Sequence, residues 1–181
     1  MPELQGADPD HVAYLGTTSK TLGPALRLGW MVLPPRLMGQ VADARTHIDH
    51  RTEHLGQLTL ANLITRHGYD RHIRRSRQRY RRRRDQLRHH LAGLRITLTG
   101  IAAGLHALAI LPPDGPTETD IEAVAQAHGV ALGCLSERTQ LSPTRQGVMI
   151  GYGRPSDHAD TSALDALTTT FAECFGQQGT A

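Results

Sequence analysis

Two short apolar runs near the start of the chain predict β-strands. The first is HVAYLG (residues 11–16), and the second is RLGWMVL (residues 27–33), which Pro34 and Pro35 close. Each run is apolar at consecutive positions, which is typical of strands that are buried on both faces and need partner strands and helical cover. Two strands are too few to build such a sheet. We therefore expect them to form the end of a larger parallel sheet whose other strands lie upstream of Met1.

The middle of the chain, from Leu37 to about Leu94, has a mostly helical pattern. It is broken near Gly56 and again at Gly68, just before Asp70, which can cap a new helix. Within this last helix, apolar residues recur at near-heptad spacing, which predicts that one narrow side packs on the protein. These residues are Ile73, Tyr80, Leu87, Leu91 and Leu94.

The second half mixes strand and helix patterns. Thr117 is placed to cap a helix that Gly129 then ends. The expected elements are strands at 96–98 and 105–111, a helix at 118–128, strands at 130–135 and 148–152, and a helix at 162–175. This order predicts a compact α+β unit behind a long helical connector. The fold class is therefore α/β passing into α+β, with the end of a large domain at 1–36, a helical connector at 37–94 and a small domain at 95–181.

The composition is that of a folded protein. The 181 residues are 39% hydrophobic and 20% charged, which is too apolar for disorder and enough for a sizeable core. No apolar run approaches the ~18 residues that a membrane helix needs, and Met1–Asp10 lacks the features of a signal peptide. We predict a cytoplasmic protein without a membrane partner. Cys134 and Cys174 are too few for a disulfide framework and lack the spacing of a zinc site.

The formal charge of +3 hides one strongly basic segment. Residues 71–88 contain ten arginines and a single acid, Asp85, while the rest of the chain is net acidic. A dense basic helix can bind nucleic acid by releasing counterions from phosphates. The apolar stripe favours instead a structural helix with a solvated basic face, on which we expect Arg75, Arg82 and Arg83. A basic nucleic-acid-binding module that uses residues 71–88 is the alternative.

Lys20, in the turn-prone sequence Thr17-Thr18-Ser19-Lys20, is the only lysine beside 19 arginines. A deprotonated lysine can attack a carbonyl and form a Schiff base, whereas an arginine presents no free amine. Chance survival of one lysine is the simpler explanation of the count alone. The neighbours change this, because the hydroxyls of Thr17 and Ser19 and the Arg27 guanidinium suit the oxygens of a phosphate. A phosphate beside a Schiff-base lysine describes pyridoxal 5′-phosphate (PLP).

The stretch from Tyr14 to Pro35, YLGTTSKTLGPALRLGWMVLPP, resembles the lysine segment of fold-type I aminotransferases. Among them it is most similar to the MocR group of transcriptional regulators, in which a GntR-type winged helix-turn-helix is fused to an aminotransferase-like domain. The resemblance continues in order through residues 54–87, 104–112, 129–137 and 147–156. It implies that Lys20 forms the Schiff base with PLP, and that Thr17, Ser19 and Arg27 bind the cofactor phosphate.

One departure from the family concerns Met149, in the sequence GVMIGYG. Aminotransferases usually place at this position the arginine that binds the substrate carboxylate, and a methionine cannot pair with a carboxylate. Arg145 and Arg154 lie nearby in the sequence, but no motif transfers the role to either. The family also places upstream of the lysine both the acid that pairs with the pyridine nitrogen and the winged helix.

The resemblance therefore implies the C-terminal part of a regulator of this kind, with a PLP-binding aminotransferase-like domain. It implies a small-molecule amine or amino acid as effector, a homodimer in the full-length protein, and DNA binding only through a missing N-terminal winged helix. Enzymatic activity stays open, and a class I/II aminotransferase is the alternative function. We expect the fragment alone to be inactive.

A histidine cluster and three serines are also candidates for a zinc site and for a hydrolase nucleophile. His47, His50 and His54 recur on one helix face with Asp43 nearby, a spacing that can bind zinc. No H-E-x-x-H motif is present and the chain holds eleven histidines, so we predict no metal site. We also expect no serine hydrolase, because no G-x-S-x-G motif surrounds the candidate serines, which are Ser136, Ser142 and Ser156.

Overall fold

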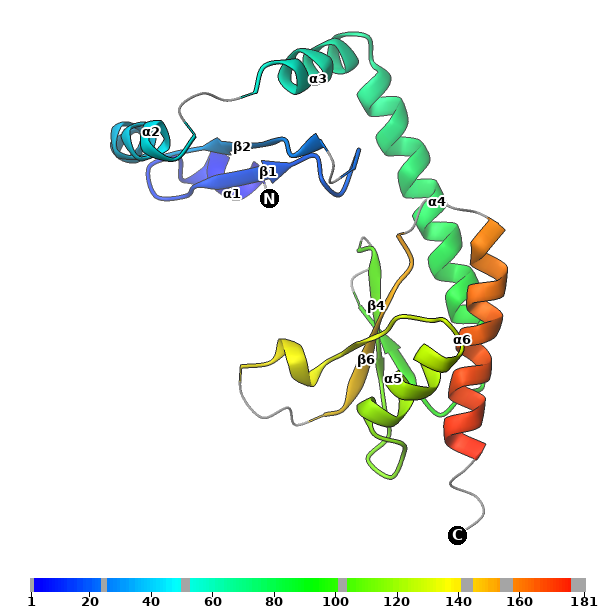
Figure 1. Cartoon of the computed structure of the whole chain (residues 1–181). Helices are drawn as coiled ribbons and strands as arrows, with labels where there is room; N and C mark the ends of the chain where they lie inside the picture. Colours follow the sequence, from blue (N-terminus) through cyan, green and yellow to red (C-terminus); the bar gives the residue numbers. More distant parts are fainter. Residues whose placement is uncertain are drawn as a thin grey trace. The chain divides into compact units, whose positions relative to one another are not determined.

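The computed structural model describes residues 2–23, 26–49, 53–100, 104–140, 145–153 and 158–176 (Figure 1). The chain divides into two compact units, Met1–Ser76 and Arg77–Ala181, and each is described by itself. Their border falls inside the helical connector predicted at 37–94. The three-part division with ends at residues 36 and 94 stays a prediction.

The first unit contains a two-stranded sheet and several helices. Its strands pair antiparallel, with Tyr14 opposite Val32 at one end and Thr17 opposite Gly29 at the other. Its elements are α1 (Pro2–Ala7), β1 (Tyr14–Thr17), β2 (Gly29–Val32), α2 (Pro35–Asp49), α3 (Leu55–Thr65) and the first part of α4 (Gly68–His90). The apolar pattern thus locates both strands, although each is shorter than predicted.

The strands of the first unit lack the cover that their apolar sequences call for, and they pair antiparallel rather than parallel. Leu15 in β1 is 68% exposed, and every residue of β2 is exposed. Within the described residues each strand has a single partner, so their outer faces and edges stay open. Their apolar residues are therefore at the surface of this unit.

The predicted breaks near Gly56 and at Gly68 are found, although both glycines lie in the first turn of the helix that follows. α3 begins at Leu55, so Gly56 lies in its first turn, where the Gly56 N–H donates to the Glu53 carboxylate at 2.7 Å. α4 begins at Gly68, so Asp70 lies in the first turn rather than at the cap. A carboxylate there still stabilises the helix through its dipole.

The second unit is an antiparallel sheet with helices on one face (Figure 1). The strands, in spatial order, are β3 (Thr97–Thr99), β4 (His106–Ile110), β6 (Gly147–Gly151) and β5 (Gly133–Cys134). The helices are α5 (Glu118–Ala127), α6 (His158–Gly176) and the end of α4. Ala109 and Val148 face the helices and are fully buried, in one core with Leu87, Ile121 and Phe171. This matches the predicted small α+β domain.

The ends of α5 confirm the predicted cap residues. Thr117 Oγ1 accepts a hydrogen bond from the Asp120 N–H at 3.2 Å, and the Asp120 carboxylate accepts one from the Thr117 N–H at 3.0 Å. This reciprocal pair satisfies two amides at the start of the helix. Past its end, Gly129 has a φ of 71°, a left-handed conformation that glycine adopts without strain.

The strand predicted at 130–135 is reduced to Gly133–Cys134. Its first residue, Val130, donates its N–H to the Ala125 carbonyl at 2.8 Å, so it closes the helix instead of joining the sheet. The strand after the following loop lies one residue earlier than predicted, at Gly147–Gly151.

The apolar stripe of α4 packs as predicted, but one arginine does not lie where we expected it. Leu87 and Leu91 are buried in the second unit. Arg75 and Arg82 are exposed, whereas Arg83 is only 5% exposed. Arg83 precedes Leu87 by one helical turn and therefore lies on the packed side of α4. The prediction that Arg83 belongs to the solvated face is wrong.

Candidate functional site

Lys20 lies in a tight turn that directly follows β1. The amides of Thr21, Leu22 and Gly23 all donate to the Thr18 carbonyl, at 3.0, 2.8 and 3.2 Å. Thr18 itself is fully buried, while the Lys20 side chain is exposed. The turn thus has a fixed base and presents the amine outward.

Two hydroxyls gather at the base of this turn. Thr17 Oγ1 lies 2.9 Å from Ser19 Oγ, and the Ser19 N–H donates to Thr17 Oγ1 at 3.1 Å. Both side chains come from the stretch that leads from β1 into the turn, so their spacing is set by local backbone bonds. The structure therefore brings these two predicted phosphate ligands together.

The carbonyl of Leu28 joins the turn to the segment that carries Arg27. It accepts from the Thr18 N–H at 3.0 Å, and the hydroxyls of Thr17 and Thr18 lie 3.2 and 3.1 Å from it. Because Leu28 follows Arg27 directly, these bonds fix the Arg27 backbone beside residues 17 and 18. Arg27 has a φ of 49°, a left-handed conformation that is uncommon outside glycine.

The donor set at this place fits a phosphate ester with an aldehyde nearby. Hydroxyls donate to phosphate oxygens, and a guanidinium adds charge and paired donors. The side chains of Lys20 and Arg27 are exposed, and within the described residues neither makes a hydrogen bond or an ion pair. The Lys20 amine and the Arg27 guanidinium are therefore available to a ligand.

Two residues of α4 that sequence reasoning missed also contact this turn. His72 Nε2 lies 2.6 Å from the Thr21 carbonyl oxygen, and the Tyr69 hydroxyl donates to Thr21 Oγ1 at 3.3 Å. Their i, i+3 spacing was visible in the sequence, because such residues lie on one side of a helix. The contact itself joins residues about 50 positions apart, so no local pattern could reveal it.

Met149, which the resemblance matches to the carboxylate-binding position, lies in the middle of β6, opposite Leu108 and Gly133. A Cβ built on Gly133 would lie 3.7 Å from Met149 Cε and 3.9 Å from Arg138 Nη2. Arg138 therefore lies on the same side of the sheet as Met149, a placement that sequence reasoning did not consider. Arg145 is exposed, and Arg154 lies outside the described residues.

Glu118 anchors the loop that carries Arg138. Its carboxylate accepts from the Gly147 N–H at 2.7 Å, from Ser136 Oγ at 2.7 Å and from the Ser136 N–H at 3.1 Å. Burial alone would raise the pKa of Glu118, but the bonds from Ser136 and from the amides of Gly147, Ser136 and Leu135 outweigh it and hold the pKa below its usual value. Glu118 is thus an ionised structural clamp.

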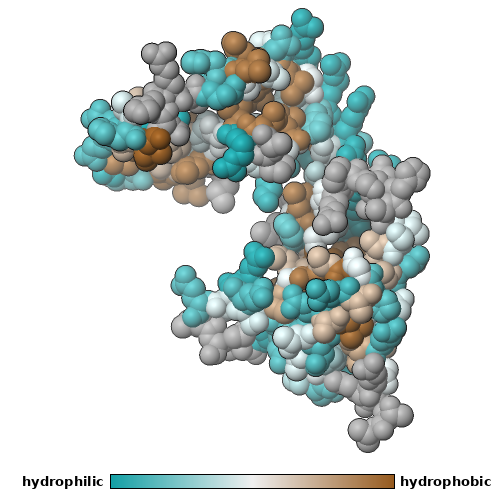
Figure 2. Space-filling model, in the orientation of Figure 1, coloured by the Kyte–Doolittle hydropathy of each residue, from teal (hydrophilic) through white to brown (hydrophobic). Residues whose placement is uncertain are grey.

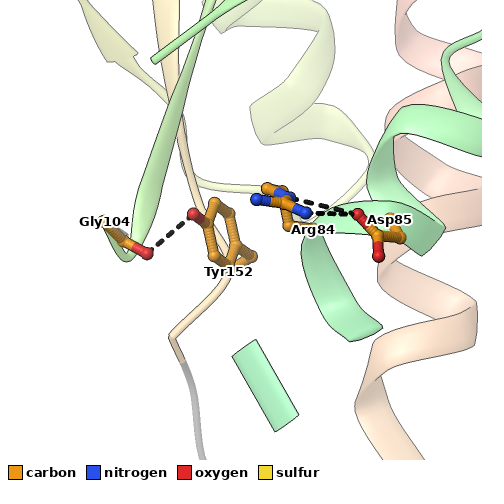
Figure 3. Close-up of polar contacts among 4 residues, drawn as sticks. All are labelled: Arg84, Asp85, Gly104 and Tyr152. Atoms are coloured by element: carbon orange, nitrogen blue, oxygen red, sulfur yellow. Dashed lines mark hydrogen bonds and ion pairs between the residues drawn. The ribbon is translucent and has the colours of Figure 1, made fainter. Parts of the chain in front are cut away.

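The basic face of α4 has its own local contacts. The Arg84 guanidinium pairs with the Asp85 carboxylate at 2.8 Å, and in Figure 3 it lies between Asp85 and the Tyr152 ring. The Tyr152 hydroxyl donates to the Gly104 carbonyl at 2.7 Å and so joins the end of β6 to the residues before β4 (Figure 3). Together with the buried Leu87, these contacts support a structural role for the helix.

The remaining candidates do not assemble into a site within the described residues. No group of three potential metal ligands is found there, and His47 Nδ1 instead lies 2.8 Å from the Asp43 carbonyl oxygen. His50, Ser142 and Ser156 lie outside the described residues. Ser136 donates to Glu118.

Neither cysteine is poised for reaction. Both thiols are buried. Burial and the neighbouring Glu122 carboxylate raise the pKa of Cys134 to about 11, so the thiolate is scarce at neutral pH. In the part of the chain that the structure describes, no helix is long and apolar enough to cross a membrane.

Comparison with known proteins places these features in context. The family profile "Aminotransferase class I and II" matches residues 2–145. The chain is 34% identical, over 95% of its length, to the HTH-type transcriptional regulator YhdI of Bacillus subtilis. It is 31% identical, over 94% of its length, to the probable rhizopine catabolism regulatory protein MocR of Rhizobium meliloti. It spans 37% and 35% of the length of these two relatives.

Solved structures share the fold. The α-aminoadipate aminotransferase LysN of Thermus thermophilus, complexed with N-(5′-phosphopyridoxyl)-L-leucine, superposes with a TM-score of 0.83 at 21% identity, over 97% of this chain and 46% of that chain. The kynurenine aminotransferase of Pyrococcus horikoshii gives a TM-score of 0.78 at 24% identity, over 92% of this chain and 42% of that chain. The predicted fold-type I aminotransferase architecture is confirmed.

Proposed function

Because this chain belongs to the family of class I and II aminotransferases, we propose that it is the PLP-binding, effector-sensing part of a transcriptional regulator. The family is PLP-dependent. The observation that carries the proposal is the set of hydrogen bonds to the Leu28 carbonyl, which holds the Lys20 turn beside Arg27.

Each residue of the site has a distinct role in this proposal. Lys20 would supply the amine that holds the cofactor aldehyde as a Schiff base, with loss of water. Ser19 would donate its hydroxyl to the phosphate, Thr17 would do the same by turning its single hydrogen away from the Leu28 carbonyl, and Arg27 would neutralise the phosphate charge. When bound, PLP withdraws electrons from an amino acid attached to it. An amine or amino-acid effector would compete with the Lys20 amine for the same aldehyde. The fraction of Lys20 that is bonded to the cofactor would then depend on effector concentration.

Two observations favour a regulator over a working enzyme. The curated relatives at 31–34% identity are HTH-type or catabolism regulators. Met149 occupies the position where the resemblance predicts a carboxylate-binding arginine, and its thioether cannot pair with a carboxylate. For the whole protein we propose DNA binding through a helix-turn-helix segment outside this chain, a homodimer, and a small-molecule amine or amino acid as effector.

The proposal is tested by titrating the chain with PLP and following the absorbance change of Schiff-base formation. The wild type should give a saturable change that Lys20→Arg abolishes, because arginine keeps the charge but offers no nucleophilic amine. Arg27→Ala should weaken apparent binding roughly tenfold or more, since it removes a charge-assisted phosphate contact worth ~1.5–3 kcal/mol. Arg75→Ala, at an exposed site on α4, is the matched control and should bind like the wild type.

The enzyme alternative is tested with the same preparation. Lacking an arginine at Met149, the chain should form no keto acid from an amino-acid donor above the rate of free PLP. Steady turnover that depends on Lys20 would replace the sensor proposal by the aminotransferase alternative.

A further inference from the structure

The start of α4 contacts the Lys20 turn at one residue, Thr21. The Thr21 carbonyl oxygen lies 2.6 Å from His72 Nε2, and Thr21 Oγ1 accepts from the Tyr69 hydroxyl at 3.3 Å. All three residues belong to the first unit. Thr21 is the residue immediately after Lys20, so these bonds act on its side chain and on the peptide group between Thr21 and Leu22, one residue beyond the lysine.

The chemistry of the acceptor fixes the proton on His72. A carbonyl oxygen only accepts, so His72 must carry a hydrogen on Nε2. Ser76 Oγ lies 3.3 Å from the same nitrogen and is buried, one helical turn further along α4. Because Nε2 carries the hydrogen, Ser76 can only accept a share of it, as a second and more distant acceptor beside the Thr21 carbonyl.

Thr21 is consequently held from both sides. Its N–H donates to the Thr18 carbonyl at 3.0 Å, and its hydroxyl lies 3.2 Å from the same oxygen. Its own carbonyl faces His72. The Lys20–Thr21 peptide group therefore cannot rotate without breaking its bond to Thr18, and the Thr21–Leu22 peptide group cannot rotate without breaking its bond to α4.

We propose that His72 and Tyr69 are positioning residues for Lys20, acting through Thr21. The Lys20 side chain makes no hydrogen bond or ion pair with the described residues, so among them only the backbone turn fixes the point from which the side chain extends. This proposal rests on the proposed function, because the direction of the amine matters only if Lys20 holds the cofactor.

The first measurement needs no cofactor. Hydrogen exchange of the amides of Thr21, Leu22 and Gly23 reports directly on the turn, since all three donate to Thr18. His72→Ala should raise their exchange roughly tenfold or more, as expected when a local opening becomes easier by about 1.4 kcal/mol. His72→Gln should restore protection in part, because its amide nitrogen can donate to the same carbonyl.

The second measurement is the rate at which borohydride traps PLP on Lys20. His72→Ala should slow trapping roughly 10- to 100-fold, the range expected from a misplacement of about 1 Å. Tyr69→Phe keeps the ring and removes only the hydroxyl, so it should fold normally and give a smaller change in the same direction. Gln78→Ala, exposed on the same helix, should match the wild type in both measurements.

The outcomes separate the two proposals. Unchanged exchange and unchanged trapping in both His72→Ala and Tyr69→Phe would overturn the positioning role while the wild type still labels at Lys20. If the wild type fails to label at Lys20, the proposed function fails, and with it the role of His72 toward the cofactor, even if exchange shows that the contact with Thr21 exists. Rescue by His72→Gln in both measurements supports positioning, because a purely steric role of the ring would not be restored by an amide.

Discussion

The two units differ in where their apolar side chains lie. Apart from Pro34, every buried apolar side chain that the structure describes belongs to the second unit, between Leu87 and Cys174. Among the described residues, the large exposed hydrophobic ones all belong to the first unit, where Figure 2 shows apolar side chains at the surface. They include Leu4, Leu15, Met38, Ile48, Leu55, Leu58 and Ile64.

This difference shows that different interactions stabilise each unit internally. The second unit closes a core of its own, which gives the largest share of the stability of a domain. The first unit orders the Lys20 turn with hydrogen bonds to Thr18, Leu28 and Thr21, with little buried apolar area around them. The candidate cofactor site therefore depends on directional contacts that single substitutions can remove.

The largest effect should come from the core of the second unit. Phe171→Ala removes a ring that is fully buried and should lower the free energy of unfolding by about 3–5 kcal/mol. Leu58→Ala, at a side chain that is 68% exposed, should change it by less than about 0.5 kcal/mol. Urea unfolding followed by circular dichroism measures both. Equal losses would mean that the first unit hides a core comparable to that of the second.

The next effect concerns the buried carboxylate of Glu118. Glu118→Gln replaces charge-assisted hydrogen bonds from Ser136 and Gly147 and should cost about 2 kcal/mol. Because the folded-state pKa lies below the ordinary value of 4.5, the contribution of Glu118 is present above that value and is lost as the pH falls through the lower folded-state pKa. Below pH 5, the thermal unfolding temperature should therefore fall less steeply with decreasing pH in Glu118→Gln than in the wild type. Parallel profiles would refute the clamp.

A smaller effect should separate two adjacent arginines of α4. Arg83→Gln should lower the free energy of unfolding by about 1–2 kcal/mol, because Arg83 is 5% exposed and its stem packs in the second unit. Arg82→Gln, at an exposed position, should stay within about 0.5 kcal/mol. Both variants lose the same charge, so equal values in urea unfolding would restore the idea of a uniformly solvated face.

The smallest effect on unfolding should come with a clear effect on association. Exposed apolar surface favours self-association, so the chain should sediment as oligomers or aggregates. Replacing Leu55 and Leu58, which are 75% and 68% exposed, by serine should shift sedimentation toward monomer, with little change in unfolding. Asn62→Ala on the same helix is the control. A monodisperse wild-type monomer would contradict self-association through this apolar surface.

Local signals in the sequence predicted much of the second unit. The cap at Thr117, the turn at Gly129 and the apolar side of α4 all follow from residues a few positions apart. Burial of Arg83 was also readable: Ser76 and Arg83 each follow a stripe residue, Ile73 and Tyr80, by three positions, and both are buried. The heptad pattern was traced through apolar residues only, so its polar members were missed.

The site was predictable only in its chemistry. Lys20, with Thr17 and Ser19 beside it, forms one short motif. The contacts from His72 and Tyr69 to Thr21 span 51 and 48 positions, and such long-range partners leave no local pattern. The apolar sequence of β2 likewise predicted that the strand needs partner strands and helical cover, but it could not tell which elements supply them; within the described residues β2 has one partner strand and is exposed.

The most direct test of the central claim is peptide mapping after reduction of the chain with PLP and borohydride. Lys20 is the only lysine, so the α-amino group of Met1 is the only competing primary amine. Our account predicts that the reduced label lies on Lys20 and falls sharply in Arg27→Ala, while labelling of Met1 stays unchanged. A label on Met1 alone, or a Lys20 label indifferent to Arg27, would contradict the claim that this turn is a cofactor site.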